Sequence, residues 1–190
     1  MHPTQALIDL RTAAASCTLC PLADTRTQVV FGVGSTKADL LLVGEAPGRE
    51  EDLEGVPFVG RSGQLLESLI TDVLGMRRND YYITNVIKCR PPGNRDPKSS
   101  EIETCKPYLD QQIEFIDPLL VVTLGNFATQ LLLETSLGIG RLHGKTYPFR
   151  RGHILPTYHP AAALRSGSRV VELMRSDLKQ AKLLLGVGHS

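Results

Sequence analysis

Four cysteines are the residues of this sequence with the clearest capacity to hold a metal. Cys17 and Cys20 form a Cys-x-x-Cys pair that Pro21 follows, whereas fifteen residues separate Cys89 from Cys105. Two thiolates separated by two residues can bind one metal centre. In a reducing compartment these cysteines are not expected to form structural disulfides. A metal or redox site is therefore the first chemistry that the sequence suggests.

Three kinds of site could use these thiols. A structural zinc site takes four thiolates, but its second pair usually has short spacing as well. A thioredoxin-like redox pair would need only Cys17 and Cys20. An iron–sulfur cluster tolerates one widely spaced pair because it is larger than a single ion. The spacing alone leaves zinc and a cluster about equal, and four unrelated buried thiols are a further alternative.

Polar groups follow four apolar segments of the chain. Gly44-Glu45-Ala46-Pro47-Gly48 comes after the first segment, and Asn85 lies near the end of the second. Gly125-Asn126 follows the third segment, and His159 follows the fourth. The carboxyl ends of parallel strands meet at one edge of a sheet, where ligands bind. We therefore expect these groups to converge on one pocket, although each alone has an ordinary structural explanation.

A pocket of this composition suits a flat polar ring. Phe58, in the loop Pro57-Phe58-Val59-Gly60, offers a face for stacking. Asn85 offers a donor and acceptors, so it can bond a ring edge that presents N–H beside C=O. His159 can donate to a carbonyl oxygen that gains negative charge. Gly44, Glu45 and Ala46 offer backbone N–H groups and one carboxylate.

Apolar periodicity predicts the elements that must position these residues. Short apolar runs predict buried strands, and apolar residues at i, i+3, i+4 spacing predict helices. The expected strands are 39–43, 82–87, 119–124 and 153–158, and the expected helices are 3–15, 63–75, 100–116, 126–134 and 169–185. Strands that alternate with helices indicate an α/β fold, with a parallel sheet covered by helices on both faces.

Turn and cap residues predict several boundaries. Gly75 is expected to end the helix over 63–75. Ser100 and Glu103 have the spacing of a capping box at the start of the next helix. Residues 90–98 hold three prolines and one glycine and are expected to be irregular. Residues 138–152 hold four glycines and are expected to form a loop or hairpin.

Composition fits one globular domain over residues 1–190. The chain is 42% hydrophobic and 22% charged, with a formal net charge of +1. Residues 141–190 hold nine Lys or Arg against two acidic residues, which predicts one basic face suited to a polyanion. No signal peptide opens the chain and no apolar run approaches the length of a membrane span. We therefore expect a soluble, cytoplasmic protein with no membrane partner.

These motifs together resemble the family 4 uracil-DNA glycosylases, the iron–sulfur branch of the uracil-DNA glycosylase superfamily. The resemblance covers about residues 15–180. It rests on the order and spacing of a few motifs: Gly44-Glu45-Ala46-Pro47-Gly48, Pro57-Phe58-Val59-Gly60, Asn85, the four cysteines and His159-Pro160. It implies a three-layer α/β/α sandwich with a central four-stranded parallel sheet. It also implies a [4Fe–4S] cluster held by Cys17, Cys20, Cys89 and Cys105, with a structural role.

The resemblance implies that the protein flips uracil out of DNA and hydrolyses its N-glycosidic bond. Glu45 and His159 would be catalytic. The uracil-binding residues would be Gly44, Glu45, Ala46, Glu51, Phe58, Asn85 and His159. Glu51 would crowd the position of the thymine methyl group, and Leu164 and Arg165 would contact DNA as an apolar wedge and a phosphate-binding cation. The expected product is an abasic site, an intermediate of base excision repair.

One departure from some relatives concerns the loop near the third cysteine. Those relatives trap uracil covalently through a histidine in an inserted basic loop. Residues 90–98 contain no histidine and no insert, so ordinary turnover is expected. We expect a monomer from a prokaryote that acts on uracil-containing DNA, single- or double-stranded. The alternative is a non-catalytic iron–sulfur module that binds or senses DNA, which would not need Glu45, Asn85 and His159 together.

Overall fold

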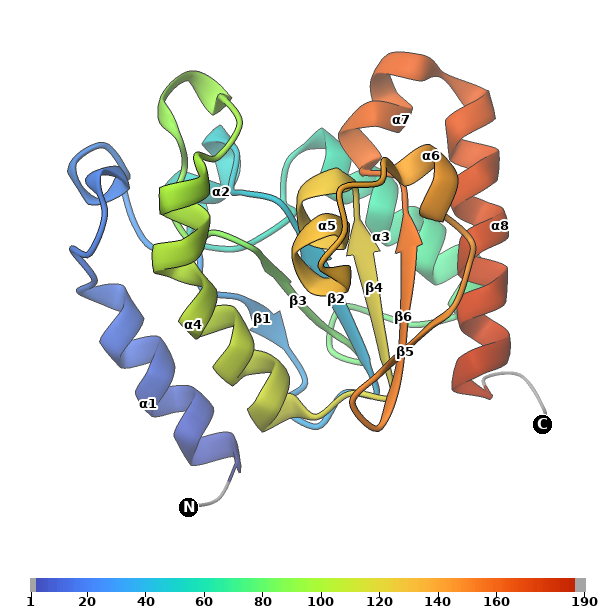
Figure 1. The fold of residues 1–190 in the computed structure, drawn as a ribbon, viewed down its shortest axis with the longest axis horizontal. Coiled ribbons are helices and arrows are strands. Elements are labelled where there is room, and N and C mark those ends of the chain that lie inside the picture. The colour runs from blue at the N-terminus through green and yellow to red at the C-terminus, as the bar shows by residue number, and fades with distance from the viewer. Residues whose placement is uncertain (1–2, 187–190) are drawn as a thin grey trace.

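The computed structural model describes residues 3–186 and shows a central sheet between two layers of helices (Figure 1). The sheet has the strand order β1-β3-β2-β4-β6-β5. Its four central strands are parallel and correspond to the four that the sequence predicts. They are β3 (Tyr82–Asn85), β2 (Leu40–Gly44), β4 (Leu120–Leu124) and β6 (Gly152–Thr157). The three-layer α/β/α sandwich is therefore confirmed.

The sheet has six strands rather than four, because a short antiparallel strand is added at each edge. β1 (Val33–Gly34) pairs with β3, and β5 (Tyr147–Phe149) forms a hairpin with β6. The hairpin was one of the two alternatives for residues 138–152. β1 has only two residues, which is too short for an alternating pattern.

The helices divide between the two faces of the sheet. Their bounds are α1 (Pro3–Ala15), α2 (Arg49–Glu54), α3 (Arg61–Leu74), α4 (Ser99–Ile116), α5 (Asn126–Leu133), α6 (Ile139–Leu142), α7 (Pro160–Ser166) and α8 (Ser168–Leu185). The 3-10 turns are η1 (Pro21–Asp24) and η2 (Pro92–Asn94). Buried residues of α1, α4 and α5 share one hydrophobic cluster with Leu41, Val43 and Val121. Those of α3, α7 and α8 share the other with Leu40, Leu42 and Val122.

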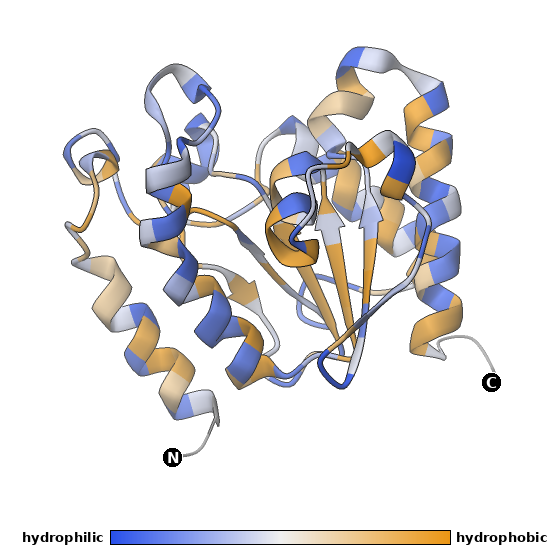
Figure 2. Ribbon diagram, in the orientation of Figure 1, coloured by the Kyte–Doolittle hydropathy of each residue, from blue (hydrophilic) through white to orange (hydrophobic). Residues whose placement is uncertain are grey.

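Burial on both faces explains the continuous apolar runs of the central strands (Figure 2). Every residue of β2 and β4 is buried. Full burial of a Val or Leu side chain stabilises the fold by about 1.5–3 kcal/mol relative to leaving it exposed. Apolar residues are therefore needed at odd and even positions alike, which fixes these strands in the middle of the sheet.

Several local predictions need correction. Lys98, not Ser100, precedes the first turn of α4, and the carboxylate that accepts its N–H belongs to Glu101 rather than Glu103. The final helix begins at Ser168, within one residue of the prediction, and Gly167 with a φ of 79° separates it from α7. Short helices α2, α6 and α7 occupy segments that are not predicted as helical. Among residues 3–186, no helix is long and apolar enough to cross a bilayer.

Candidate active site

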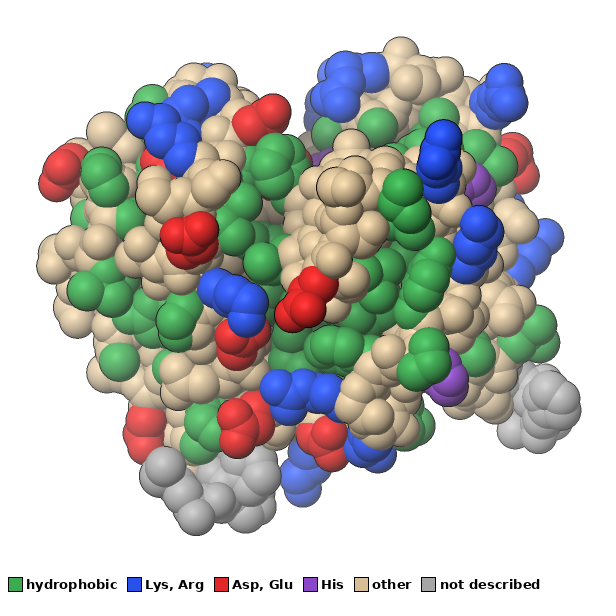
Figure 3. Space-filling view, viewed as in Figure 1, with side chains coloured by type: hydrophobic (Ala, Val, Ile, Leu, Met, Phe, Trp, Pro, Cys, Tyr) green, Lys and Arg blue, Asp and Glu red, His purple; other side chains and the backbone are tan. Residues whose placement is uncertain are grey.

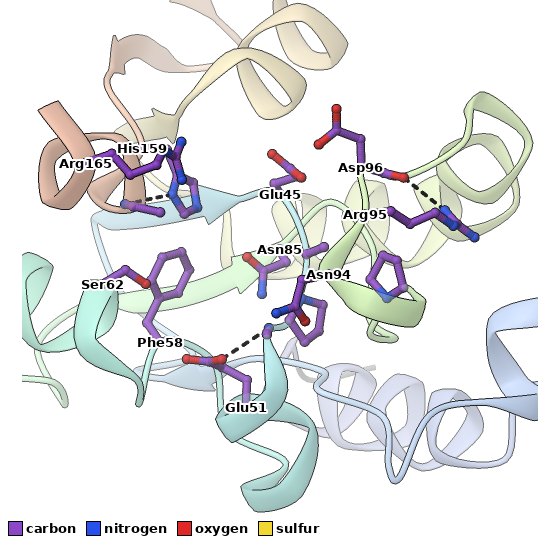
Figure 4. Close-up of a pocket in the computed structure, with 15 residues that line it drawn as sticks. Glu45, Glu51, Phe58, Ser62, Asn85, Asn94, Arg95, Asp96, His159 and Arg165 are labelled. Atoms are coloured by element: carbon purple, nitrogen blue, oxygen red, sulfur yellow. Dashed lines mark hydrogen bonds between the residues drawn. The ribbon is translucent and has the colours of Figure 1, made fainter.

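A pocket of about 390 Å³ opens at the carboxyl edge of the central strands. Figure 4 shows that side chains from four separate segments point into it, and Figure 3 shows the molecule notched between α7 and the loop that precedes α4. Its lining includes seven of the residues that the sequence predicts: Glu45, Ala46, Glu51, Phe58, Asn85, His159 and Arg165. Parallel strands therefore bring these residues together as expected.

Asn85 provides the most informative polar atom in the pocket. It ends β3, where it aligns with Gly44 of β2. Its side chain is 1% exposed, and its Oδ1 is buried without a hydrogen-bond partner. An unsatisfied buried acceptor costs about 1–3 kcal/mol, so its presence indicates a ligand donor at this position. Gly44 lies behind the pocket, where a Cβ would overlap Asn85 and the ring of Phe58. Its contribution is space for those two side chains.

Phe58 forms an apolar wall of the pocket. Its backbone has a φ of 56°, which is uncommon for a residue other than glycine. The Arg78 guanidinium donates to the Phe58 carbonyl oxygen at 2.7 Å, and a Cβ at Gly63 would overlap the Phe58 backbone. The Phe58 ring centroid lies 5.9 Å from that of His159. The strained loop therefore holds the ring beside the histidine.

Glu51 holds the Phe58 loop in place. Its Oε1 accepts the N–H groups of Val59 and Gly60 at 3.0 and 2.9 Å, and its Oε2 accepts the N–H of Gly48 at 3.1 Å. The sequence predicts that Glu51 contacts the base, but it does not predict these hydrogen bonds to the Phe58 loop. The Gly48-x-x-Glu51 spacing is that of a capping box and could have indicated it.

His159 is fixed as a neutral hydrogen-bond donor. It lies two residues after β6 and is the N-cap of α7, where its Nδ1 accepts the N–H of Ala161 at 3.1 Å. The pKa of His159 is lowered to about 4, chiefly by burial and also by the charge of Arg165, while the charge of Glu51 acts in the opposite direction. At neutral pH the ring therefore carries one proton. Because Nδ1 accepts, that proton is on Nε2.

Glu45 lies between His159 and Asp96 (Figure 4). The pKa of Glu45 is raised to about 7, chiefly by burial and also by the charge of Asp96, while the charge of Arg165 acts in the opposite direction. The carboxyl group is therefore close to half ionised at neutral pH. This is the range in which a carboxylate can exchange protons efficiently.

The loop after β3 supplies lining residues that the sequence did not predict. They are Pro91, Asn94, Arg95 and Asp96. Ser62, at the start of α3, also lines the pocket and was not predicted. The Arg95 guanidinium donates to both oxygens of the buried Glu101, at 2.9 and 2.6 Å, which fixes the loop to α4. The three prolines predict only that this loop is irregular. Its position directly after β3 could have indicated that it lines the pocket.

Asn126 does not belong to the pocket. Its Oδ1 accepts the N–H of Ile139 at 2.8 Å and so fixes α6. Leu164 is also absent from the lining, although it is next to Arg165, which belongs to it. The Leu164 side chain is 44% exposed, so it is not a core leucine.

The four cysteines lie together in a second, smaller pocket. All four line one small pocket with the end of α1, the loop after β3 and α4. The Arg26 guanidinium donates to Cys89 Sγ at 3.6 Å, and the Lys88 N–H donates to Cys105 Sγ at 3.4 Å. Such N–H donors to sulfur are typical of iron–sulfur sites. Burial raises the pKa of Cys89 to about 11, which disfavours a reactive redox thiol.

Within residues 3–186, no three His, Cys, Asp or Glu side chains are close enough to hold one metal ion. Four cysteine thiols around one pocket are a donor set that an iron–sulfur cluster uses. The donor set therefore agrees with a cluster.

Comparison with known proteins identifies the family. A family model described as the uracil DNA glycosylase superfamily matches residues 31–182. The chain belongs to this superfamily. It is 44% identical to the type-4 uracil-DNA glycosylase of Archaeoglobus fulgidus, over 96% of this chain and 94% of that protein. The type-4 enzymes of Sulfurisphaera tokodaii and Thermotoga maritima are 44% and 41% identical, over 89% and 87% of this chain and 80% and 88% of theirs.

Membership of the superfamily confirms the resemblance drawn from the motifs. The expectation of one basic face over residues 141–190 stays a prediction, and two of these basic residues are paired with acids. Arg151 lies in the turn between β5 and β6, at the opposite edge of the sheet, where it pairs with Asp39 and Asp117. Arg175 pairs with Asp72 and Glu172. Within residues 141–190, therefore, Arg165 is the basic residue that lines the pocket.

Proposed function

We propose that this chain is a monofunctional uracil-DNA glycosylase. It flips uracil out of single- or double-stranded DNA, hydrolyses the N-glycosidic bond and leaves an abasic site for base excision repair. The observation that carries the proposal is one cavity that combines the unpartnered Asn85 Oδ1, the Phe58 ring and the His159 Nε2–H donor. The 44% identity to type-4 enzymes over nearly the whole chain supports it.

Uracil recognition follows from the groups in the pocket. Phe58 stacks on the ring, backbone groups of Glu45 and Ala46 lie at its edge, and Gly44 leaves space for Phe58 and Asn85. Asn85 Oδ1 accepts the uracil N3–H, and its amide N–H donates to O4. Cytosine has an amino group in place of O4, so it would meet the Asn85 donor with another donor. Glu51 would crowd the thymine methyl group. Its hydrogen bonds to the N–H groups of Val59 and Gly60 keep Phe58 in place.

Bond cleavage uses His159 as the donor. When the C1′–N1 bond breaks, its electron pair passes to the uracil ring and negative charge grows at O2. The Nε2–H of the neutral imidazole is held to donate to that oxygen, because Nδ1 is occupied by the Ala161 N–H. A donor that meets charge only in the transition state accelerates the chemical step.

Glu45 acts on the sugar side of the bond. As a carboxylate it stabilises the positive charge on the sugar and positions the water that attacks C1′. Leu164 fills the space that the flipped base leaves, and Arg165 binds a backbone phosphate. Extrusion of the base costs a few kcal/mol, least at a mispair.

Excision should depend on pH through Glu45. Its ionised form falls as pH falls through about 7, so the single-turnover rate should decrease about tenfold per pH unit below that value. The Glu45→Gln protein should excise uracil slowly, and its rate should not show this decrease at low pH. Asp96→Asn removes a charge that raises the Glu45 pKa, so the decrease in rate should begin at a lower pH. A parental profile that stays flat from pH 5 to 8 would remove this role.

The cysteine site would hold a [4Fe–4S] cluster through Cys17, Cys20, Cys89 and Cys105. Such a cluster supplies a structural cross-link here, since it joins the end of α1 to α4 and to the segment that follows Asn85. The purified protein should be brown and absorb broadly at about 400 nm.

Cys89→Ala should lose iron and lower the melting temperature. Thr104→Ala is the matched control, because Thr104 lines the same pocket without a thiol; it should keep both. Iron analysis and thermal unfolding measure the two effects. A colourless, stable and fully active parental protein with bound zinc contradicts the cluster.

The direct test of activity is incubation with an oligonucleotide that contains one uracil, followed by alkali. Strand cleavage at uracil, with none at thymine or cytosine, supports a glycosylase. Binding without cleavage supports the alternative, a non-catalytic iron–sulfur module. We propose that the enzyme acts as a cytoplasmic monomer, which sedimentation of the purified protein tests.

A further inference from the structure

A buried lysine lies between the two sites. Lys88 follows β3 and directly precedes Cys89, and its side chain is 2% exposed. Its Nζ donates to three oxygens: Thr84 Oγ1 at 2.7 Å, the Asn85 carbonyl at 2.6 Å and Gln112 Oε1 at 2.6 Å. Three acceptors use all the donors of an ammonium group.

None of the three acceptors is a carboxylate. Buried lysines are normally paired with an acid, because an isolated ammonium loses its hydration without compensation. Around Lys88 the compensation comes from the three neutral oxygens alone. Because burying this ammonium without a carboxylate costs free energy, we expect Lys88 to have a specific role.

The contact with Asn85 indicates that task. The Lys88 ammonium bonds the main-chain oxygen of the residue whose side chain faces the pocket. The next two N–H groups, of Val86 and Ile87, donate to the carbonyl oxygens of Gly44 and Glu45. The turn after Asn85 is thus held to β2 on one side and to Lys88 on the other. The direction of the Asn85 amide depends on this backbone.

A second set of bonds fixes Lys88 itself. The Gln112 amide donates to the Phe31 carbonyl at 2.8 Å, and Thr84 Oγ1 donates to the same oxygen at 2.8 Å. Gln112 and Thr84 are fully buried. The ammonium therefore has one arrangement available, as a positioning group requires.

We infer that Lys88 is a positioning residue that orients Asn85 for uracil recognition and joins the base pocket to the cysteine site. It does not touch the base. This role rests on the proposed function, since uracil is the ligand that Asn85 would bind. The cysteine loop would thereby contribute to base selection as well as to folding.

The test is a double-mutant cycle on binding of free uracil to the iron-loaded protein, measured by calorimetry. Lys88→Met should weaken uracil binding about tenfold, as expected when a charge-assisted hydrogen bond that orients the recognition group is lost. In an Asn85→Ala background the same change should weaken it less than about twofold, because residues that act through one another are not additive. Iron content should equal the parental value.

Lys106→Met is the matched control. Lys106 follows Cys105 and pairs with Asp110 on the surface of α4, without contact to Asn85. It should leave uracil binding unchanged. If Lys88→Met does not fold, Thr84→Val removes one acceptor from Lys88 and should weaken uracil binding by a smaller factor that again disappears with Asn85→Ala.

The outcomes separate this inference from the proposed function. If the parental chain excises uracil and Lys88→Met binds it with parental affinity, the inference is overturned and the function stands. Equal losses in both backgrounds, or a loss in proportion to missing iron, also overturn it, because they indicate a structural role alone. If the parental chain neither cleaves nor binds uracil, the function fails and the inference with it.

Discussion

His159→Ala should lower the single-turnover rate of uracil excision by roughly 10²–10³-fold, a loss of about 2.7–4 kcal/mol of transition-state stabilisation. The removed group is an Nε2–H donor whose orientation is set by the Ala161 N–H at Nδ1. It meets developing charge only during bond cleavage. Binding of uracil DNA should weaken much less, since phosphate contacts such as that of Arg165 remain and depend steeply on salt.

The change also removes the N-cap of α7, which costs about 1 kcal/mol and lowers the melting temperature by about 2–4 °C. His153→Ala is the matched control, because His153 lies in β6, the strand that leads to His159, but is exposed. It should keep the parental rate. Rate, DNA affinity and melting temperature are measured on one preparation. A well-folded His159→Ala protein that excises uracil at the parental rate would refute the catalytic role.

Asn85→Asp should abolish most uracil excision, by about 10²-fold or more. The buried Oδ1 has no partner in the protein, so the new carboxylate would gain no compensating bond. It could no longer donate to uracil O4 and would repel that oxygen. Ionised Asp accepts from both oxygens, and therefore it suits the cytosine amino group better. Weak activity on cytosine is the expected gain.

Asn126→Asp makes the same chemical change outside the pocket. Asp preserves the acceptor that Ile139 N–H needs, so uracil excision should be unaffected. Rates on uracil and cytosine oligonucleotides decide the outcome. Asn85→Asp with undiminished uracil activity would show that Asn85 does not read the base.

The central strands could be predicted from the sequence because their burial is encoded locally. A strand covered on both faces must be apolar at every position, and Leu40–Val43 and Leu120–Val122 satisfy this without reference to any other segment. Parallel strands then placed Glu45, Asn85 and His159 at one edge by topology alone. The cysteine spacing and the motif order likewise indicated the family.

Other features depend on contacts between segments that are distant in sequence. The two-residue strand β1 is defined only by its pairing with β3. The proximity of Asp96 to Glu45, which raises the Glu45 pKa, follows from how the loop after β3 folds over the pocket. Asn126 shows the converse: a polar residue after a strand that instead fixes α6.

The chemical state of the site was decided by tertiary structure. Burial sets the neutral form of His159, and the N–H of α7 selects its tautomer. Lys88 reads in sequence as a surface residue before a cysteine, yet α4 supplies Gln112 and covers it completely. A residue type specifies which protons and charges are available. Only the packing of other segments around it determines desolvation and hydrogen-bond partners, and these fix what the group does.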